Sequence, residues 1–369
     1  MSDTVPYSTA GWFLRAFPVP KYLAMPAIGV DISDYAIKFL YLKHHKGEVS
    51  LGAHGKVDLP LEAIERGEVK DPATIVKLLK RIRQDHGIAY AHLALPEEHA
   101  YLFQMEVPRV TKNEVEDQLE FHLKENVPIG AEEAVFDYNV LRTTKDHYVL
   151  NVSVYPMTIA SQYVGVLEDA GFKPLSVEIE GQATARALLP LQESVPTLII
   201  DIGRNDASLS ISQNGIVTFT ANLETGGDYF SRAIARHLDI SFQEAERLKR
   251  QHGFTNTQEG LSVYQALVPA MDEFTEAVHK HIMYWQMHST TSDESHEPVE
   301  RVVLVGGSAN TKGVVEYLEA ALELPVDVGN VWSNIPGFSH DTPPLHAKES
   351  VEYTTSIGLA LRSILRVIK

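Results

Sequence analysis

The stretch IGVDISDYAIKFLYL, residues 28 to 42, decides how this chain folds. An apolar run ends in Asp31, polar residues interrupt it at Ser33 and Asp34, and a second apolar run continues through Lys38. This pattern predicts two strands joined by a tight hairpin, with a carboxylate at the end of the first strand. That carboxylate either marks a hairpin tip alone or points toward a phosphate-binding site.

A second stretch, TLIIDIG at residues 197 to 203, repeats the arrangement. Its apolar run ends in Asp201, followed by Ile202 and Gly203, and strand-like sequence follows in both places. The repeat predicts an internal duplication of a hairpin-rich α/β unit. A carboxylate at such a strand end can hold Mg²⁺ or its water, while N–H groups of the turn face phosphate oxygens. Two such hairpins facing each other would hold a triphosphate in a cleft between two lobes.

Composition limits the possible classes of protein. A chain of 369 residues is long enough for two or more domains. No stretch approaches the roughly 18 uncharged apolar residues of a membrane span, so we do not expect an integral membrane protein. A net charge of −17 without a basic stripe argues against nucleic-acid binding. The absence of cysteine is consistent with a cytoplasmic protein.

Hydrophobic periodicity and turn residues predict the other elements. We expect helices at residues 72–86, 111–124, 158–170, 229–285 (with breaks) and 311–324, a buried strand at 91–96, and two strands within 134–155. Capping boxes at Thr111/Glu114 and Ser241/Glu244 support the helix starts. The spacing of the histidines, such as His279 and His281, argues against a histidine metal site.

Further glycine-rich and helical motifs offer contacts for a nucleotide. Glycines beside a strand or helix end let the backbone approach a phosphate or a flat ring closely. The candidates are Gly306, Gly307 and Ser308 in VLVGGSA, Gly226 and Gly227 in TGGDYF, and Glu246 and Lys249 in EAERLKR.

The order and spacing of these motifs resemble the actin-like ATPase superfamily of actin, DnaK-type chaperones and sugar kinases. Within it the chain is similar to the FtsA family and above all to the PilM family, the cytoplasmic actin-like component of the type IV pilus inner-membrane platform. The resemblance runs from about Ala27 to Arg366 and includes EVEDQLEFHLKENVPIGAEEAVFDYNVL, LEDAGFKPLSVEIEGQATARAL and ISFQEAERLKRQHG. It implies an α/β actin-like ATPase fold: two lobes of duplicated mixed β-sheet with flanking helices, and an FtsA/PilM-type inserted subdomain.

The resemblance also implies a division of the chain into subdomains. The expected parts are an N-terminal arm at 1–26, a first lobe at 27–95 completed by about 176–196 and 336–369, an inserted subdomain at 96–175, a second lobe at 197–232 and 299–335, and a helical subdomain at 233–298. In the arm, Trp12, Phe13, Leu14 and Phe17 form an apolar patch that either docks on a membrane or partner or folds back on its own domain.

By the same resemblance, ATP or ADP with Mg²⁺ binds in the cleft. The implied catalytic residues are Asp31, Asp201 and Glu180, of which Asp31 and Asp201 hold Mg²⁺ and Glu180 orients a water. The implied nucleotide-binding residues are Ser33, Asp34, Lys38, Gly203, Gly226, Gly227, Glu246, Lys249, Gly306, Gly307 and Ser308. The alternative for Glu180 is a half-exposed acid at a helix N-terminus.

The first loop departs from the family pattern of Asp-Ile-Gly followed by small hydroxyl residues. Ser33 replaces the glycine, Asp34 follows, and bulky Tyr35 comes next. A Cβ at Ser33 hinders a left-handed turn, and a carboxylate at Asp34 adds repulsion toward a γ-phosphate unless it points outward. We therefore expect ATP binding with slow or absent hydrolysis.

The resemblance finally implies partners and a location. A PilN-like single-span membrane protein would dock its short cytoplasmic tail beside the insert, which otherwise is decoration without a ligand. The protein would then lie in the cytoplasm, peripheral to the inner membrane, with pilus motor ATPases and a second copy of itself as further partners. The alternatives are an FtsA-like filament or division anchor and a sugar or acid kinase of the same fold.

Overall fold

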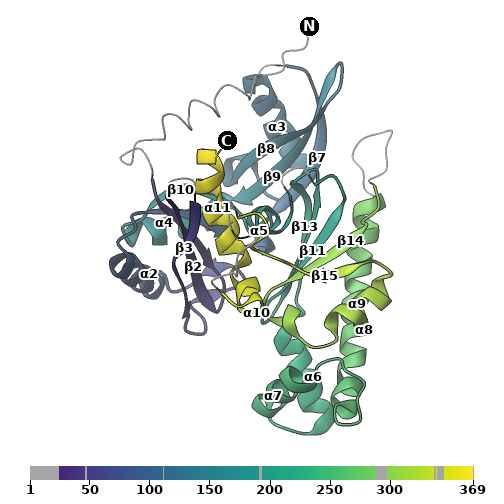
Figure 1. The fold of residues 1–369 in the computed structure, drawn as a ribbon. Coiled ribbons are helices and arrows are strands. Elements are labelled where there is room, and N and C mark those ends of the chain that lie inside the picture. The colour runs from purple at the N-terminus through teal and green to yellow at the C-terminus, as the bar shows by residue number, and fades with distance from the viewer. Residues whose placement is uncertain are drawn as a thin grey trace.

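The computed structural model describes residues 25–45, 48–110, 112–190, 193–287, 297–335, 338 and 345–368. Two five-stranded sheets flank a pair of helices, and a smaller sheet and a helical extension lie at opposite ends of the molecule (Figure 1). The predicted apolar patch at 12–17 and the capping residue Thr111 lie outside the described residues.

The first sheet forms the core of the first lobe. Its strands are β1 (Ala27–Ile32), β2 (Ala36–His45), β3 (Glu48–Asp58), β6 (Tyr90–Leu95) and β10 (Lys173–Ile179), in the order β10-β6-β1-β2-β3. The β1, β2 and β3 strands form an antiparallel meander, and β6 runs parallel to β1 and to β10. Every residue of β1 is buried, as its continuous apolar run predicts for a central strand covered on both faces.

The second sheet repeats this topology and forms the core of the second lobe. Its strands are β11 (Thr197–Ile202), β12 (Ala207–Gln213), β13 (Ile216–Leu223), β14 (Arg301–Val305) and β15 (Val326–Val328), in the order β13-β12-β11-β14-β15. An antiparallel meander is again followed by two parallel strands. The duplication predicted from the two Asp-Ile strand ends is therefore confirmed.

Two helices connect the sheets, α5 (Glu180–Leu188) and α11 (Thr354–Ile368). They touch through their backbones, because a Cβ added at Gly358 would lie 1.8 Å from the carbonyl oxygen of Ala183. One at Gly29 of β1 would lie 2.2 Å from the carbonyl oxygen of Ser356. Side chains from both sheets and both helices share one apolar core in this region.

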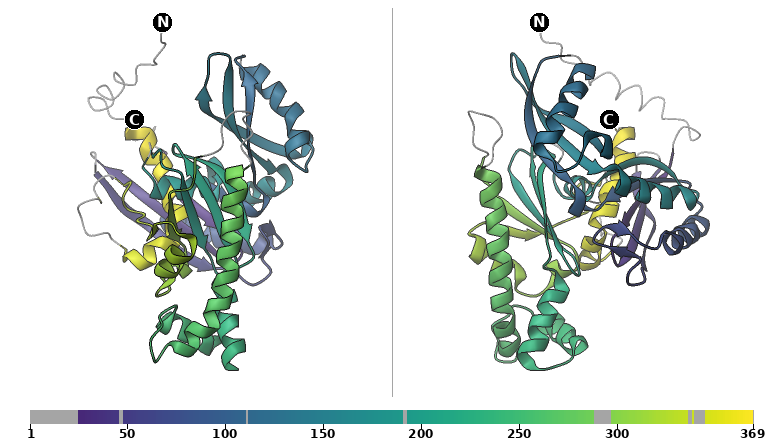
Figure 2. Two further views of the ribbon diagram at one scale, coloured as in Figure 1. Left: turned by 90° about the vertical axis from the view of Figure 1, so that its right-hand side faces the viewer. Right: turned by 180° about the vertical axis from the view of Figure 1, so that it is seen from behind.

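A small inserted subdomain projects at the end of the molecule opposite α6 and α7 (Figure 2). Its strands β7 (Tyr101–Pro108), β8 (Ala134–Thr143) and β9 (His147–Pro156) pair in the order β7-β9-β8, and its helix is α3 (Lys112–Asn126). The two strands expected within 134–155 are confirmed, whereas β7 was not predicted. In β9, Asn151 is fully buried and donates to the carbonyl oxygen of Val217 at 2.9 Å, which ties the insert to the second lobe.

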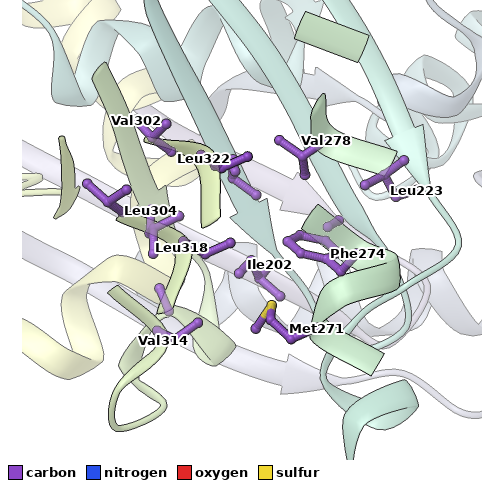
Figure 3. Packing of buried hydrophobic residues seen from close by; sticks show 14 of the residues in the cluster. Ile202, Leu223, Met271, Phe274, Val278, Val302, Leu304, Val314, Leu318 and Leu322 are labelled. Carbon is purple, nitrogen blue, oxygen red and sulfur yellow. The ribbon is translucent and has the colours of Figure 1, made fainter. Parts of the chain in front are cut away.

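The helices of the second lobe are α6 (Gly227–Leu238), α7 (Phe242–His252), α8 (Leu261–Met287) and α9 (Val314–Leu322). Ile202 of β11 packs between Leu318 of α9 and the α8 residues Met271 and Phe274 (Figure 3). Of the predicted capping box of α7, the Ser241 half is confirmed, because its hydroxyl accepts the N–H of Glu244 at 3.2 Å. The Glu244 carboxylate instead accepts hydrogen bonds from Arg247.

The remaining elements are helices on the outer faces and short connections. They are β4 (Ile64–Glu65), β5 (Glu68–Val69), α2 (Pro72–His86), η1 (Glu97–His99), η2 (Ala131–Glu133), α4 (Met157–Asp169), η3 (Gly307–Asn310), α10 (Ala347–Ser350) and η4 (Val351–Tyr353). The helices predicted at 72–86 and 158–170 are confirmed within a residue at each end. Among the described residues, no helix combines the length and apolar character needed to cross a bilayer.

Candidate functional site

The first candidate carboxylate lies beside a lysine. Asp31 of β1 is the register partner of Lys38 in β2, and Oδ2 of Asp31 lies 3.5 Å from Nζ of Lys38. Their side chains are 6% and 23% exposed, so the pair is largely shielded from water. Burial lowers the pKa of Lys38, but the carboxylates of Asp31, Asp201 and Glu180 raise it above its usual value. Lys38 is therefore held in its charged form among acids from both lobes.

The second carboxylate occupies the equivalent position in the other lobe. Asp201 of β11 is paired in register with Ser208 of β12, seven residues on, as Asp31 is with Lys38. The pKa of Asp201 is raised to about 6, mainly by burial; Lys38 opposes this rise and Asp31 contributes to it. Because Lys38 and Asp31 both act on Asp201, the two strand ends meet at one site between the lobes, as the sequence predicts.

Glycines surround the end of β11. Gly306 has a φ of +84°, and a Cβ there would lie 2.3 Å from Oδ1 of Asp201. The N–H of Gly227 donates to the carbonyl oxygen of Gly203 at 3.0 Å, and the hydroxyl of Ser308 donates to the same oxygen at 3.4 Å. A Cβ at Gly226 would meet the backbone of residues 205 and 206 at 2.5 Å. The structure thus brings these five predicted residues together.

The other predicted residues of this region have different surroundings. A Cβ at Gly307 would have no neighbour nearer than 3.9 Å, so sterics do not require glycine there. Lys249 is 8% exposed and donates to the carbonyl oxygen of Gly227. Burial lowers the pKa of Lys249 to about 8, although Asp228 and Glu246 raise it. Lys249 therefore supports the first turn of α6, while Glu246 forms an ion pair with Arg250.

The first loop avoids both difficulties expected from its sequence. The N–H and the hydroxyl of Ser33 both donate to the carbonyl oxygen of Ala36, at 3.0 and 3.2 Å. Ser33 does not have a positive φ, so the predicted hindrance of a left-handed turn does not arise. The Asp34 carboxylate turns toward the β4–β5 hairpin, where it accepts the N–H groups of Arg66 at 3.1 Å and Gly67 at 3.2 Å.

Two glutamates that the sequence analysis missed lie next to Glu180. Glu97 of η1 is 4% exposed and accepts the hydroxyl proton of Ser210 at 2.8 Å. Burial raises the pKa of Glu97 and that of Glu98 to about 7. Burial also raises the pKa of Glu180, the first residue of α5, well above its usual value, and Asp31 and Glu98 add to this. Burial and the nearby acids therefore disfavour the ionised form of Glu180 relative to a free carboxylate.

The two hairpin turns also touch each other directly, through residues that the sequence analysis did not assign to the site. The side-chain amide of Asn205 donates to the hydroxyl of Tyr35. The guanidinium carbon of Arg204 lies 5.1 Å from the centre of the Tyr35 ring. Tyr35 belongs to the β1–β2 turn, whereas Arg204 and Asn205 follow β11, so these contacts bridge the lobes.

These residues fit a nucleotide better than an all-protein metal site. The glycines at Gly203, Gly226, Gly227 and Gly306 let the turns pack closely around the end of β11, and backbone N–H groups of such turns suit a phosphate chain. No group of three or more potential ligand side chains occurs in the described part of the chain. Mg²⁺ at this site would take most of its ligands from phosphate and water, with Asp31 and Asp201 as the nearest carboxylates.

Comparison with known families identifies the chain. A family model described as type IV pilus assembly protein PilM matches residues 29–364. The ethanolamine utilization protein EutJ of Escherichia coli (strain K12) is 30% identical over 153 residues, which are 42% of this chain and 47% of that protein. The cell division protein FtsA of Bacillus subtilis (strain 168) is 25% identical over 216 residues, 55% of this chain and 46% of that protein. The chain thus spans about half the length of these curated relatives.

Solved structures share the fold. A PilM-PilN type IV pilus biogenesis complex matches with a TM-score of 0.76 at 21% identity, covering 92% of this chain and 99% of that one. MreB5 of Spiroplasma citri bound to ADP matches with a TM-score of 0.56 at 14% identity, covering 93% and 97%. At these identities the structures establish the actin-like fold, and the family model, which spans most of the sequence, establishes the relationship. The chain belongs to the family of type IV pilus assembly protein PilM.

Proposed function

We propose that this protein is a cytoplasmic adaptor of a type IV pilus platform that holds an adenine nucleotide, ATP or ADP, between its lobes. The observation that supports the nucleotide site best is the meeting of Asp31, Lys38 and Asp201 beside the glycines at the end of β11. Lys38 offers positive charge to phosphate, and the N–H groups of the turns offer hydrogen bonds. The binding of ADP by MreB5 of the same fold is consistent with this site.

We propose further that hydrolysis is slow. A general base must take a proton from the attacking water, and a neutral carboxyl group cannot do so. Burial and the neighbouring acids Asp31 and Glu98 raise the pKa of Glu180 above its usual value, which reduces the share of the ionised form that can accept the proton. Mg²⁺, when bound to the phosphates, would neutralise part of their charge and hold their geometry. The chain's own contribution is then retention of the nucleotide rather than turnover.

The nucleotide proposal has a direct test. The protein is purified and denatured, and the released small molecules are identified by mass spectrometry. Separately, stripped protein is titrated with labelled ADP and ATP in the presence of Mg²⁺, and phosphate release is followed. Binding without measurable turnover is expected. Failure to bind either nucleotide would contradict the site, and turnover at rates typical of ATPases would contradict the slow hydrolysis.

The partner we propose is the short cytoplasmic tail of a PilN-like single-span membrane protein. The similar solved structure is a complex of PilM with PilN. The insert offers a three-stranded sheet whose outer strands, β7 and β8, each pair on one side only within the sheet. An extended peptide can add to such an edge through backbone hydrogen bonds. Binding of this tail would place the protein at the inner surface of the membrane.

The partner proposal is tested by capture. The purified chain is immobilised and incubated with a detergent-solubilised membrane fraction from its own source. Recovery of a single-span protein is expected, and a synthetic peptide of that protein's cytoplasmic tail should compete with it. Recovery that the peptide leaves unchanged would contradict tail docking. Polymers detected by light scattering with ATP would favour the FtsA-like alternative.

A further inference from the structure

The bridge between the two hairpin turns joins the lobes at the phosphate end of the proposed site. We call Tyr35, Arg204 and Asn205 the interlobe bridge. Tyr35 follows the Ser33–Asp34 pair of the first turn, and Arg204 directly follows Gly203 of the second. The Asn205 amide bonds the Tyr35 hydroxyl, and the Arg204 guanidinium lies over the ring at a distance typical of cation–π contacts. The bridge therefore spans the two loops between which a phosphate chain would lie.

Arg204 is the cation of this bridge. Its side chain is 58% exposed, and its Nε lies 3.2 Å from Oδ2 of Asp228. The guanidinium itself is exposed, whereas Asp228 is 13% exposed and Tyr35 is half-buried, so Arg204 reaches both partners from the solvent side and can exchange them for a stronger one. An arginine that binds phosphate through two parallel hydrogen bonds makes a stronger interaction. A phosphate within reach would therefore compete well for Arg204.

The charges around the bridge make the number of phosphates important. Asp31 and Asp201 both act on Lys38, and Asp206 acts on Asp201. Lys38 is already paired with Asp31 at 3.5 Å. A terminal phosphate would add negative charge among these acids. Arg204 is the positively charged member of the interlobe bridge and would offset that charge.

We infer that Arg204 senses the terminal phosphate of a nucleoside triphosphate. The triphosphate draws the guanidinium away from Tyr35 and Asp228 and so opens the interlobe bridge, whereas a diphosphate leaves the bridge closed. This inference rests on the proposed nucleotide site and adds to it the group that distinguishes the two nucleotides. Tyr35 acts here as a positioning residue, because it holds Arg204 through its ring and holds the lobes together through its hydroxyl.

The chain contains no cysteine, which allows the lobes to be labelled without background. Spin labels are attached at Arg81→Cys on α2 and Glu319→Cys on α9, both exposed and on different lobes. Their separation is measured by pulsed electron paramagnetic resonance with no nucleotide, with ADP and with a non-hydrolysable ATP analogue. We expect the ADP distribution to match the nucleotide-free one and the analogue distribution to differ.

Variants assign this difference to the bridge. In Arg204→Ala, the ADP and analogue distributions should become the same, and the affinity for the analogue should fall about tenfold while that for ADP stays unchanged. Tyr35→Phe keeps the ring and loses the bond to Asn205, so it should move the ADP distribution toward that of the analogue. Arg232→Ala, an exposed arginine on α6, is the matched control and should behave as the unaltered chain.

The outcomes separate the inference from the function on which it rests. If the unaltered chain binds neither nucleotide, the proposed site and the sensor are both wrong. If it binds both but Arg204→Ala weakens them equally, or leaves the difference between distributions in place, the site stands and the sensor is wrong.

Discussion

Gly306 and Asp201 lie so close that a Cβ at Gly306 would stand 2.3 Å from the Oδ1 atom of Asp201. No side chain can occupy that space unless the carboxylate or the backbone moves. The carboxylate is half-buried, and the backbone of Gly306 has a φ of +84°, which an L-residue rarely adopts. The proposed site therefore depends on this one glycine for its shape.

The Gly306→Ala variant should consequently bind nucleotide more weakly. We expect the affinity for ADP to fall by about tenfold or more, because Asp201 must shift. Isothermal titration calorimetry measures the change. The control is Gly87→Ala at the end of α2, where φ is +67° and no atom lies within 4 Å of the added Cβ. Gly87→Ala should cost only about 1 kcal/mol in backbone strain and leave affinity intact. Equal affinities for the two variants would contradict the role of Gly306.

Lys38→Met should weaken nucleotide binding and stability together. It removes the cation that Asp31 faces at 3.5 Å and leaves a 6% exposed carboxylate without that partner. The expected loss is on the order of 2 kcal/mol of unfolding free energy in urea, with at least about a tenfold loss of affinity. Lys56→Met removes an exposed pair with Glu352 and should cost no more than about 1 kcal/mol. A Lys38→Met protein that binds ADP normally would remove Lys38 from the site.

The buried Glu97 should make stability fall as the pH rises. Its folded-state pKa of about 7 exceeds the ordinary 4.5, so the folded state binds more protons between these values. Its contribution is complete below about pH 4.5 and is lost as the pH passes through 7. Glu97→Gln keeps an acceptor for Ser210 and removes the titration, and it should reduce the loss between pH 5 and 8 by about 1–3 kcal/mol.

The measurement for Glu97 is a series of urea unfolding curves across that pH range. Glu98 and Asp201 also have raised pKa values, so a smaller slope should remain in the variant. Glu276→Gln is the control, because its exposed carboxylate has a pKa lowered by Lys280 and completes its titration below the range. If the unfolding free energy changes with pH equally in Glu97→Gln and in the unaltered chain, Glu97 is ionised in the folded protein.

Glu178 should be a main electrostatic support of the region between the lobes. Its side chain is 8% exposed and accepts hydrogen bonds from Arg186 and Arg362. Arg186 also donates to the carbonyl oxygen of Gly358 at 3.0 Å, so the cluster joins β10, α5 and α11. Glu178→Gln leaves two arginines without their counter-charge and should cost about 3 kcal/mol, measured by thermal or urea unfolding.

Glu244→Gln removes an exposed pair with Arg247 on α7 and is the matched control for Glu178→Gln. The control should unfold at the same temperature and urea concentration as the unaltered chain. If both variants unfold alike, the Glu178 cluster contributes no more than a surface ion pair.

The residues of the site that could be predicted from sequence are those whose position follows from the pattern of their immediate neighbours in the chain. Asp31 and Asp201 follow continuous apolar runs, and Gly203 and Gly306 follow strands, so their placement needs only the strand assignment. Strand β7 also has a local signal, because Tyr101, Phe103, Met105 and Val107 alternate with period two. This alternation is enough to predict the strand.

The missed parts depend on contacts between distant residues. Glu97 lies in the polar run PEEH, and its burial results from Ser210, 113 residues further on. Tyr35 meets Asn205 across 170 residues. The direction of the Asp34 carboxylate depends on the turn at Arg66 and Gly67, whose N–H groups it accepts. A single sequence carries no local signal for such pairs.

The close contact of α5 with α11 is a point about which the two lobes could rotate. Because Gly358 of α11 meets Ala183 of α5 with no room for a side chain, the two helices can turn against each other but cannot slide or part without losing that fit. The insert and the α6–α7 end lie at opposite ends of the molecule, far from the contact between α5 and α11 (Figure 1). Any rotation of one lobe about this contact would therefore be enlarged at the ends of the molecule, in proportion to their distance from it.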